Sequence, residues 1–184
     1  MTVLWSPRRL DYTGAQLSSL FLRRRFGIEG DGLVAFTGAC RVDPAHMRDL
    51  EDLLEGSAIA GDLMLHFLGE HFDRDLERMV LRQHLLAALA ADEIGRRARV
   101  RIERRGDDLW HHGRKLSISI ATLTPVSSVL HFAVNVVTTG VPVRAAGLRE
   151  LGVAPAPLAR AVLAAWRDEL ASVRSKRCRV RGAP

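Results

Sequence analysis

The chain has 184 residues, of which 47% are hydrophobic, and we expect residues 1–184 to form a single domain with a substantial core. No apolar run approaches the roughly 20 residues of a membrane span, and the opening MTVLWSPRRLDY lacks the order of a secretion signal, so we expect a cytoplasmic protein. The net charge of +6 invites acidic partners, but the basic residues are scattered and only one tyrosine is present, which disfavours a nucleic-acid platform.

The first half of the chain predicts two helices and two strands. The run AQLSSLFLRRRFG indicates a short helix that ends at Gly27, and GDGLVAFTGACRV indicates a strand. A helix then follows in DPAHMRDLEDLLEG, with Asp43 as its N-cap, Pro44 at its first position and Gly56 as its stop. After the small-residue loop GSAIAG, the apolar run DLMLHFLGEHF fits a strand better than a helix.

The second half predicts a long helix, three strands and a last helix. Residues 73–95 form the clearest helix, because apolar residues recur at spacings of three and four. The stretch from Arg97 to Gly140 alternates in period two and predicts three consecutive antiparallel strands, broken at Gly106, Gly113 and Pro125. The last helix is expected to start at Pro157, and its apolar side consists of Leu158, Val162, Trp166, Leu170 and Val173.

Lysine is rare in this chain. Of 27 basic residues only Lys115 and Lys176 are lysines, which leaves 27 − 2 = 25 arginines. Arginine is a planar fork that stays protonated, whereas lysine is a compact point charge that reaches a single oxygen in a narrow pocket. The lysine at position 115, beside Arg114, therefore marks the second of the predicted turns as a candidate site.

The order of elements around this turn resembles the core of biotin and lipoate protein ligases and octanoyltransferases. In residues 62–136, a strand and a long helix lead to Asp107-Asp108, then to the hairpin GRKL that carries Lys115, and then to LHFAVNV with His131 and Asn135. The resemblance implies an α+β fold with a mixed, largely antiparallel sheet flanked by helices, as in the superfamily that includes the class II aminoacyl-tRNA synthetases.

Nearly the full chain is also similar to a smaller family of unknown function, domain of unknown function 366. The segments that carry this similarity are YTGAQLSSLFLRRRFGIEGDGLVAFTGAC, HMRDLEDLLEG, RKLSISIATLTPVSSVLHFAVN and GLRELGV. This second resemblance implies the same ligase-like fold and brings no established activity.

The ligase resemblance also implies roles for individual residues. It makes Lys115 a catalytic residue that offsets charge on an acyl carbonyl, carboxylate or phosphate oxygen. It places Asp108 near a nucleotide base and Asn135 on a strand that faces the same pocket. We take as further ligand-binding candidates Arg114, His131, Tyr12 and Gln16.

Two departures from the ligase pattern limit the expected chemistry. Adenylate-forming ligases carry a loop rich in Gly and Arg before the strand that corresponds to DLMLHF, and here the loop is GSAIAG, without arginine. Octanoyltransferases carry a nucleophilic cysteine after the Asn-bearing strand, and here VTTGVPV has none. ATP-dependent adenylation is therefore disfavoured, a thioester intermediate at that place is excluded, and the sequence names no cofactor.

Neither the cysteines nor the histidines indicate a metal or disulfide site. Cys40 and Cys178 lie in no CxxC or Cys/His cluster, and we expect Cys40 to be a small buried residue. A metal site could be built from His46, Asp49 and Asp52, or from His66, Glu70, His71 and Asp73. We favour hydrogen-bonding histidines in both places, because the second set lies in a predicted strand.

Three functions follow from these observations. The first is an acyl- or carboxylate-handling enzyme with Lys115 as its electrostatic stabiliser. The second, nearly as well supported, is a non-catalytic domain that binds a small molecule or nucleotide. The third and least favoured is a nucleic-acid-binding module, and a homodimer stays open as a state of any of them.

Overall fold

The computed structural model describes residues 1–182, in four α-helices, one 3-10 turn and eight strands. The helices are α1 (Phe21–Phe26), α2 (Leu50–Glu55), α3 (Leu76–Ala98) and α4 (Pro155–Arg177), and the 3-10 turn is Pro44–His46. The strands are β1 (Thr2–Trp5), β2 (Gly32–Arg41), β3 (Ala60–His71), β4 (Glu103–Arg105), β5 (Asp108–His111), β6 (Arg114–Lys115), β7 (Ser117–Leu123) and β8 (Ser128–Asn135).

The strands form two sheets. The larger sheet has the order β1-β2-β3-β8-β7, and the smaller one has the order β4-β5-β6. Among the strands of residues 1–182, β1 and β2 form the one parallel ladder, and the other ladders are antiparallel. The predicted α+β class with a mixed, largely antiparallel sheet is therefore confirmed.

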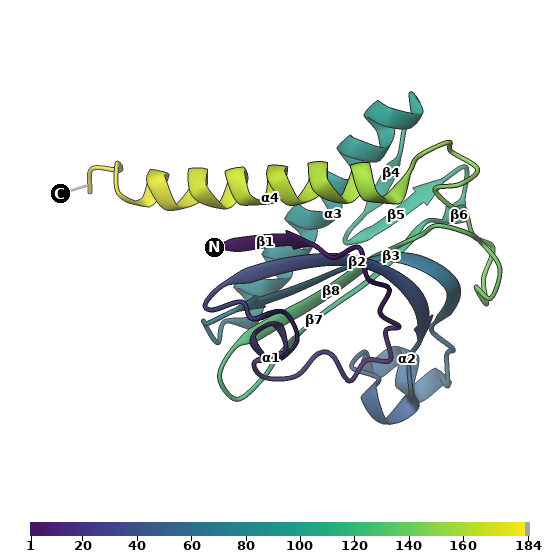
Figure 1. The fold of residues 1–184 in the computed structure, drawn as a ribbon, viewed down its shortest axis with the longest axis horizontal. Helices are drawn as coiled ribbons and strands as arrows, with labels where there is room; N and C mark the ends of the chain where they lie inside the picture. The colour runs from purple at the N-terminus through teal and green to yellow at the C-terminus, as the bar shows by residue number, and fades with distance from the viewer. Residues whose placement is uncertain (183–184) are drawn as a thin grey trace.

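Two long helices cover one face of the larger sheet (Figure 1). Alternate residues of the strands, such as Leu65 and Phe67 of β3, pack with apolar side chains of α3 and α4 in the main core. Trp166 of α4 is the largest fully buried side chain there. Helix α4 then continues beyond the body of the molecule, and residues 171–182 are all exposed.

Irregular segments with two short helices cover the opposite face (Figure 1). The intervening strand residues, such as Phe36 and Met64, form a second core with Tyr12, Leu17 and Leu22 from the segment around α1. This segment crosses β2 so closely that a Cβ atom at Gly38 would lie 2.0 Å from the carbonyl oxygen of Leu10. Only glycine fits at that crossing.

The prediction of one continuous helix over residues 43–55 is wrong, because two separate short elements form there. Asp43 caps only a 3-10 turn, Met47 is extended, and α2 starts after a second cap, Asp49, which accepts from the backbone N–H groups of residues 51 and 52. The sequence offered two N-caps, and each starts its own short element. The predicted stop at Gly56 is confirmed, since this glycine ends α2 with a φ of 66°.

The prediction of three strands after the long helix is also wrong. Residues 97 and 98 still belong to α3, which ends at Ala98, with Arg99 as its C-cap, rather than at Gly95, and five strands follow it. Turns at Gly106 and Gly113, with φ of 64° and 69°, fold β4, β5 and β6 into a separate small sheet. Period two marked the extended backbone correctly from Glu103 onward, but it cannot show where a chain passes from one sheet to another.

The last helix differs from the prediction in its first residue and in the exposure of the last residue predicted for its apolar side. Helix α4 starts at Pro155 instead of Pro157, and Val173 is 52% exposed because the helix has left the body by that point. Within residues 1–182, no helix has both the length and the apolar character of a membrane span.

Candidate functional site

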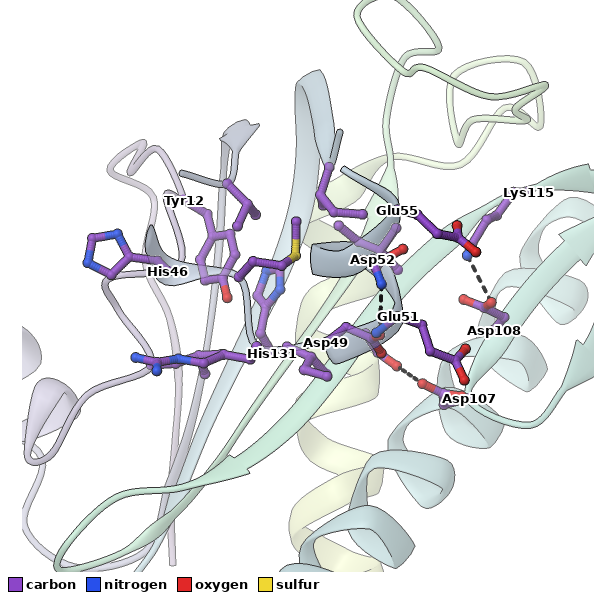
Figure 2. A pocket seen from close by; sticks show the side chains of 18 residues that line it. Tyr12, His46, Asp49, Glu51, Asp52, Glu55, Asp107, Asp108, Lys115 and His131 are labelled. Atoms are coloured by element: carbon purple, nitrogen blue, oxygen red, sulfur yellow. Dashed lines mark hydrogen bonds and ion pairs between the residues drawn. The ribbon is translucent and has the colours of Figure 1, made fainter. Parts of the chain in front are cut away.

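A cavity of about 340 Å³ lies on the sheet face opposite α3 and α4. Its walls come from α2 and the segments beside it, from β7 and β8, and from the turn before β5 (Figure 2). The lining residues are Tyr12, Leu17, Val42, His46, Met47, Arg48, Asp49, Glu51, Asp52, Glu55, Ile59, Asp107, Asp108, Lys115, Ile118, Ser119, Ile120 and His131.

The two caps of the broken helix set which side chains of α2 face this cavity. With Asp49 as the N-cap of α2, the acidic residues of the helix line the cavity, and its leucines face outward. Leu50 and Leu54 are 65% and 78% exposed. The acidic residues of this short helix thus line the cavity, although Glu51 and Glu55 remain exposed, and its apolar residues face solvent, which is unusual for a surface helix.

Lys115 lies at one end of the cavity and forms an ion pair with Asp108. Its Nζ is 2.9 Å from Oδ2 of Asp108 in the neighbouring strand, and 5.9 Å from the centre of the Trp110 ring. Burial raises the pKa of Asp108 although Lys115 lowers it, and the nearby charges of Asp107 and Asp52 raise it further. The charge of the lysine is thus already largely offset within the protein.

Asn135 supports this hairpin from outside the cavity. Its Nδ2 donates to the backbone carbonyls of Lys115 and Ala146, at 3.2 and 3.1 Å. Among residues 1–182, its buried Oδ1 has no hydrogen-bond partner. Asn135 therefore holds the backbone of Lys115, and its side chain is not part of the cavity wall.

Asp107 belongs to a hydrogen-bonded network that links the cavity to α3. Its Oδ2 accepts from Gln83 of α3 at 2.6 Å and from the Ser119 hydroxyl at 2.5 Å. Gln83 also reaches the Ser119 oxygen, at 2.7 Å. This triangle fixes the carboxylate of Asp107 at the edge of the larger sheet.

Carboxylates dominate the lining. Six of them reach the cavity, namely Asp49, Glu51, Asp52, Glu55, Asp107 and Asp108. Burial raises the pKa of Asp52, and the charges of Asp49 and Glu55 raise it further. The cavity is acidic although the whole chain carries a net charge of +6.

Three stacked rings form the other end of the site. Tyr12 lies on His131 with ring centres 3.5 Å apart and an angle of 9° between the planes. His131 Nε2 lies 3.0 Å from His66 Nδ1, and His66 Nε2 lies 3.2 Å from the carbonyl oxygen of Gly38. Burial lowers the pKa of His66 to about 4 and that of His131 well below its ordinary value, so both rings are neutral near pH 7.

The structure brings four of the seven predicted site residues together and separates three. Tyr12, Asp108, Lys115 and His131 line the cavity. Arg114 instead pairs with Glu150 at 2.7 Å, and Asn135 lies behind the hairpin. The side chain of Gln16 does not line the cavity, because it forms hydrogen bonds to the backbone of residues 11 and 13 in its own loop.

Sequence reasoning considered Asp49 and Asp52 only as possible metal ligands and did not predict an acidic side of the cavity. The run DLEDLLE carries carboxylates at positions 49, 51, 52 and 55, which was the available signal. It is indistinguishable from a solvated helix face until the fold places α2 over the sheet.

No group of three or more His, Cys, Asp or Glu side chains within residues 1–182 is placed to hold a metal ion. Glu70 instead accepts from the backbone N–H of Leu20 and from the Ser127 hydroxyl. Asp73 pairs with Arg82 at 2.7 Å. Cys40 is fully buried, and burial raises the pKa of its thiol to about 12, which disfavours a nucleophilic role.

Comparison with known proteins gives one family and one fold. The sequence pattern of the family described as a domain of unknown function, DUF366, matches residues 1–181. An uncharacterised protein of Methanocaldococcus jannaschii is 35% identical over 159 residues. The match covers 83% of this chain and 72% of the M. jannaschii protein. A solved protein of unknown function from Pyrococcus horikoshi is 40% identical and superposes with a TM-score of 0.94, covering 100% of this chain and 99% of that one.

More distant solved structures are ligases. The biotin protein ligase of Aquifex aeolicus, solved with biotin and ATP, has a TM-score of 0.61 at 14% identity, over 95% of this chain and 72% of the ligase. A putative lipoate protein ligase of T. acidophilum with bound lipoic acid has a TM-score of 0.56 at 13% identity, over 92% of this chain and 86% of that one. At these identities the likeness shows a shared fold.

Proposed function

Since this chain belongs to the DUF366 family and has the fold of biotin and lipoate protein ligases, we propose that it binds a small molecule in the cavity between α2 and strands β7 and β8. The observation that carries the proposal is the convergence of Tyr12, Asp108, Lys115 and His131 on this one cavity. A volume of about 340 Å³ suits a ligand of the size of a cofactor fragment or metabolite.

Binding is better supported than acyl transfer. An acyl-transfer role needs Lys115 to face a developing oxyanion, whereas its Nζ is held by Asp108 at 2.9 Å. A covalent route through Cys40 is disfavoured by the raised pKa of its thiol and by its absence from the cavity wall. The third function, nucleic-acid binding, gains no support from an acidic cavity.

A ligand screen with a blocked cavity tests this proposal. The purified chain is screened by thermal shift against nucleotides, carboxylic acids, amines and heterocyclic metabolites. The variant Ile120→Trp is screened in parallel, because the indole ring is larger than the isoleucine side chain and should fill the cavity. The matched control is Val143→Trp, at a residue that is 54% exposed and outside the cavity lining. We expect hits that disappear in Ile120→Trp and persist in Val143→Trp.

The role of Lys115 is tested with a neighbouring control. Lys115→Ala removes a cavity residue, and Arg114→Ala removes a cation whose partner, Glu150, lies outside the cavity. We expect hits to weaken only in Lys115→Ala. Hits that bind Ile120→Trp as well as the unmodified chain would move the ligand site elsewhere and refute the proposal.

A further inference from the structure

We propose that the ligand of this cavity carries a cationic group with several N–H donors, such as an amidinium, guanidinium or ammonium group, which lies against the carboxylates of α2 and of the turn before β5. This inference rests on the proposed ligand site and names the chemical class that the site selects.

The first argument is the charge balance of the lining. Of the six carboxylates, Asp108 alone forms an ion pair within 4 Å among residues 1–182, and its partner is Lys115. The other cation of the wall with a fixed charge, Arg48, forms no ion pair within 4 Å with any of the six carboxylates in the described residues. Neighbouring carboxylates repel one another, and a cationic ligand would offset that repulsion.

Figure 2 shows how these carboxylates are grouped. Asp52 and Glu55 of α2 approach from one side of the Lys115 end, and Asp107 and Asp108 approach from the other. Lys115 pairs with Asp108, and Asp107 accepts from Gln83 and Ser119. Among residues 1–182, Asp52 and Glu55 form no ion pair, so their carboxylates are the acceptors that remain there. A ligand that satisfies them must donate hydrogen bonds, and a charged donor forms the stronger ones.

The second argument comes from the buried rings at the other end. Both histidines are neutral, so each carries one N–H. Because the Gly38 carbonyl only accepts, His66 must donate from Nε2 and accept at Nδ1. His131 then donates from Nε2, and its Nδ1 keeps an unprotonated lone pair.

Neither this Nδ1 nor the Tyr12 hydroxyl has a hydrogen-bond partner within the described residues. Tyr12 and His131 are only 3% and 2% exposed, and both line the cavity. Figure 2 shows the Tyr12 oxygen directed toward the other lining side chains. The buried end of the site therefore also presents a hydrogen-bond acceptor, which fits a ligand rich in N–H groups.

The remaining wall favours an organic cation over a metal ion. Apolar side chains also line the cavity, namely Leu17, Val42, Met47, Ile59, Ile118 and Ile120. No three ligating side chains in residues 1–182 converge on one point, as a metal ion requires. A flat apolar body with a cationic end matches both the rings and the carboxylates.

Three compounds of one shape and different charge test the inference. Benzamidine is cationic, benzamide is neutral and benzoate is anionic, and each is titrated into the full chain with detection by heat or by protein NMR shifts. We expect benzamidine to bind about tenfold more tightly than benzamide, and benzoate to bind most weakly.

The variant Asp52→Asn removes one cavity charge at constant shape. We expect it to weaken benzamidine severalfold and to leave benzamide unchanged. Its control is Asp168→Asn, whose side chain is 67% exposed and pairs with Arg167 on α4. An equal effect of the two variants would overturn the inference.

The two proposals fail in different ways. Tighter binding of benzamide or benzoate, lost in Ile120→Trp, would overturn the cationic ligand and keep the binding site. Displacement of benzamidine by millimolar MgCl₂ but not by NaCl of equal ionic strength would replace the organic cation with a metal ion. Absence of binding by all three compounds, together with an empty screen, would overturn both.

Discussion

Acid should destabilise this protein through the two stacked histidines before most carboxylates titrate. Folding lowers the pKa of His66 to about 4 and that of His131 well below 6.5. Between these pKa values the two histidines bind protons in the unfolded chain but not in the folded one. The stability that their neutral forms contribute is therefore fully present above pH 6.5 and is lost as the pH falls toward 4. Between pH 7.5 and 5, His66 costs about 2 kcal/mol at about 1.4 kcal/mol per pH unit, and His131 adds a loss of the same sign.

The assay is urea unfolding at pH 7.5 and pH 5, followed by circular dichroism. We expect His131→Gln to lose only about 2 kcal/mol over this interval, because one refused proton remains. His112→Asn is the control, since it removes an exposed histidine at a φ of 49°, which asparagine tolerates. A loss below about 1 kcal/mol in the unmodified chain, or an equal loss in His131→Gln, would refute the reasoning.

Three further predictions concern packing and backbone support. Trp166→Ala should cost about 3 to 5 kcal/mol of unfolding free energy, because the ring is fully buried, whereas Val173→Ala on the same helix should change it by at most about 0.5 kcal/mol. Gly38→Ala should prevent soluble folding, because its Cβ would lie 2.0 Å from the Leu10 carbonyl oxygen. Asn135→Ala should cost about 1 to 3 kcal/mol, because two backbone carbonyls lose their donor.

Each of these has a direct readout. Urea unfolding measures the Trp166, Val173 and Asn135 variants, and similar values for the first two would contradict the packing of α4. The yield of soluble protein measures Gly38→Ala, beside Gly182→Ala, where an added Cβ meets nothing within 4 Å. Normal yield and normal melting of Gly38→Ala would contradict the close crossing at β2.

Local sequence patterns predicted those elements in which the type of each residue, apolar or polar, matches its burial in the structure. The period of α3 shows in the sequence because its buried residues, such as Leu86 and Ile94, follow the helical repeat. Strand β3 was predicted from its apolar run, and all residues from 64 to 71 are buried. The hairpin of Lys115 was found from a resemblance over many spaced elements, and Gly113 indeed turns it.

The parts of the site that escaped prediction depend on contacts between distant segments. Arg114 and Lys115 are neighbours in sequence, yet one pairs with Glu150, 36 residues away, and the other with Asp108. The acidic wall exists only because α2 lies over β7 and β8. No local period encodes either fact, and the net charge of +6 pointed to the opposite sign.

Helix α4 is one continuous helix, but its two parts differ in local stability. Its first part is held in the core as far as Trp166, while the stretch from there to Arg177 extends about 17 Å at 1.5 Å per residue, and its last turns contact only solvent. A helix without packing opens at a small free-energy cost. Amide hydrogens near Trp166 should therefore exchange only when the whole protein unfolds, whereas those of the last turns should exchange within seconds, in one unbroken helix.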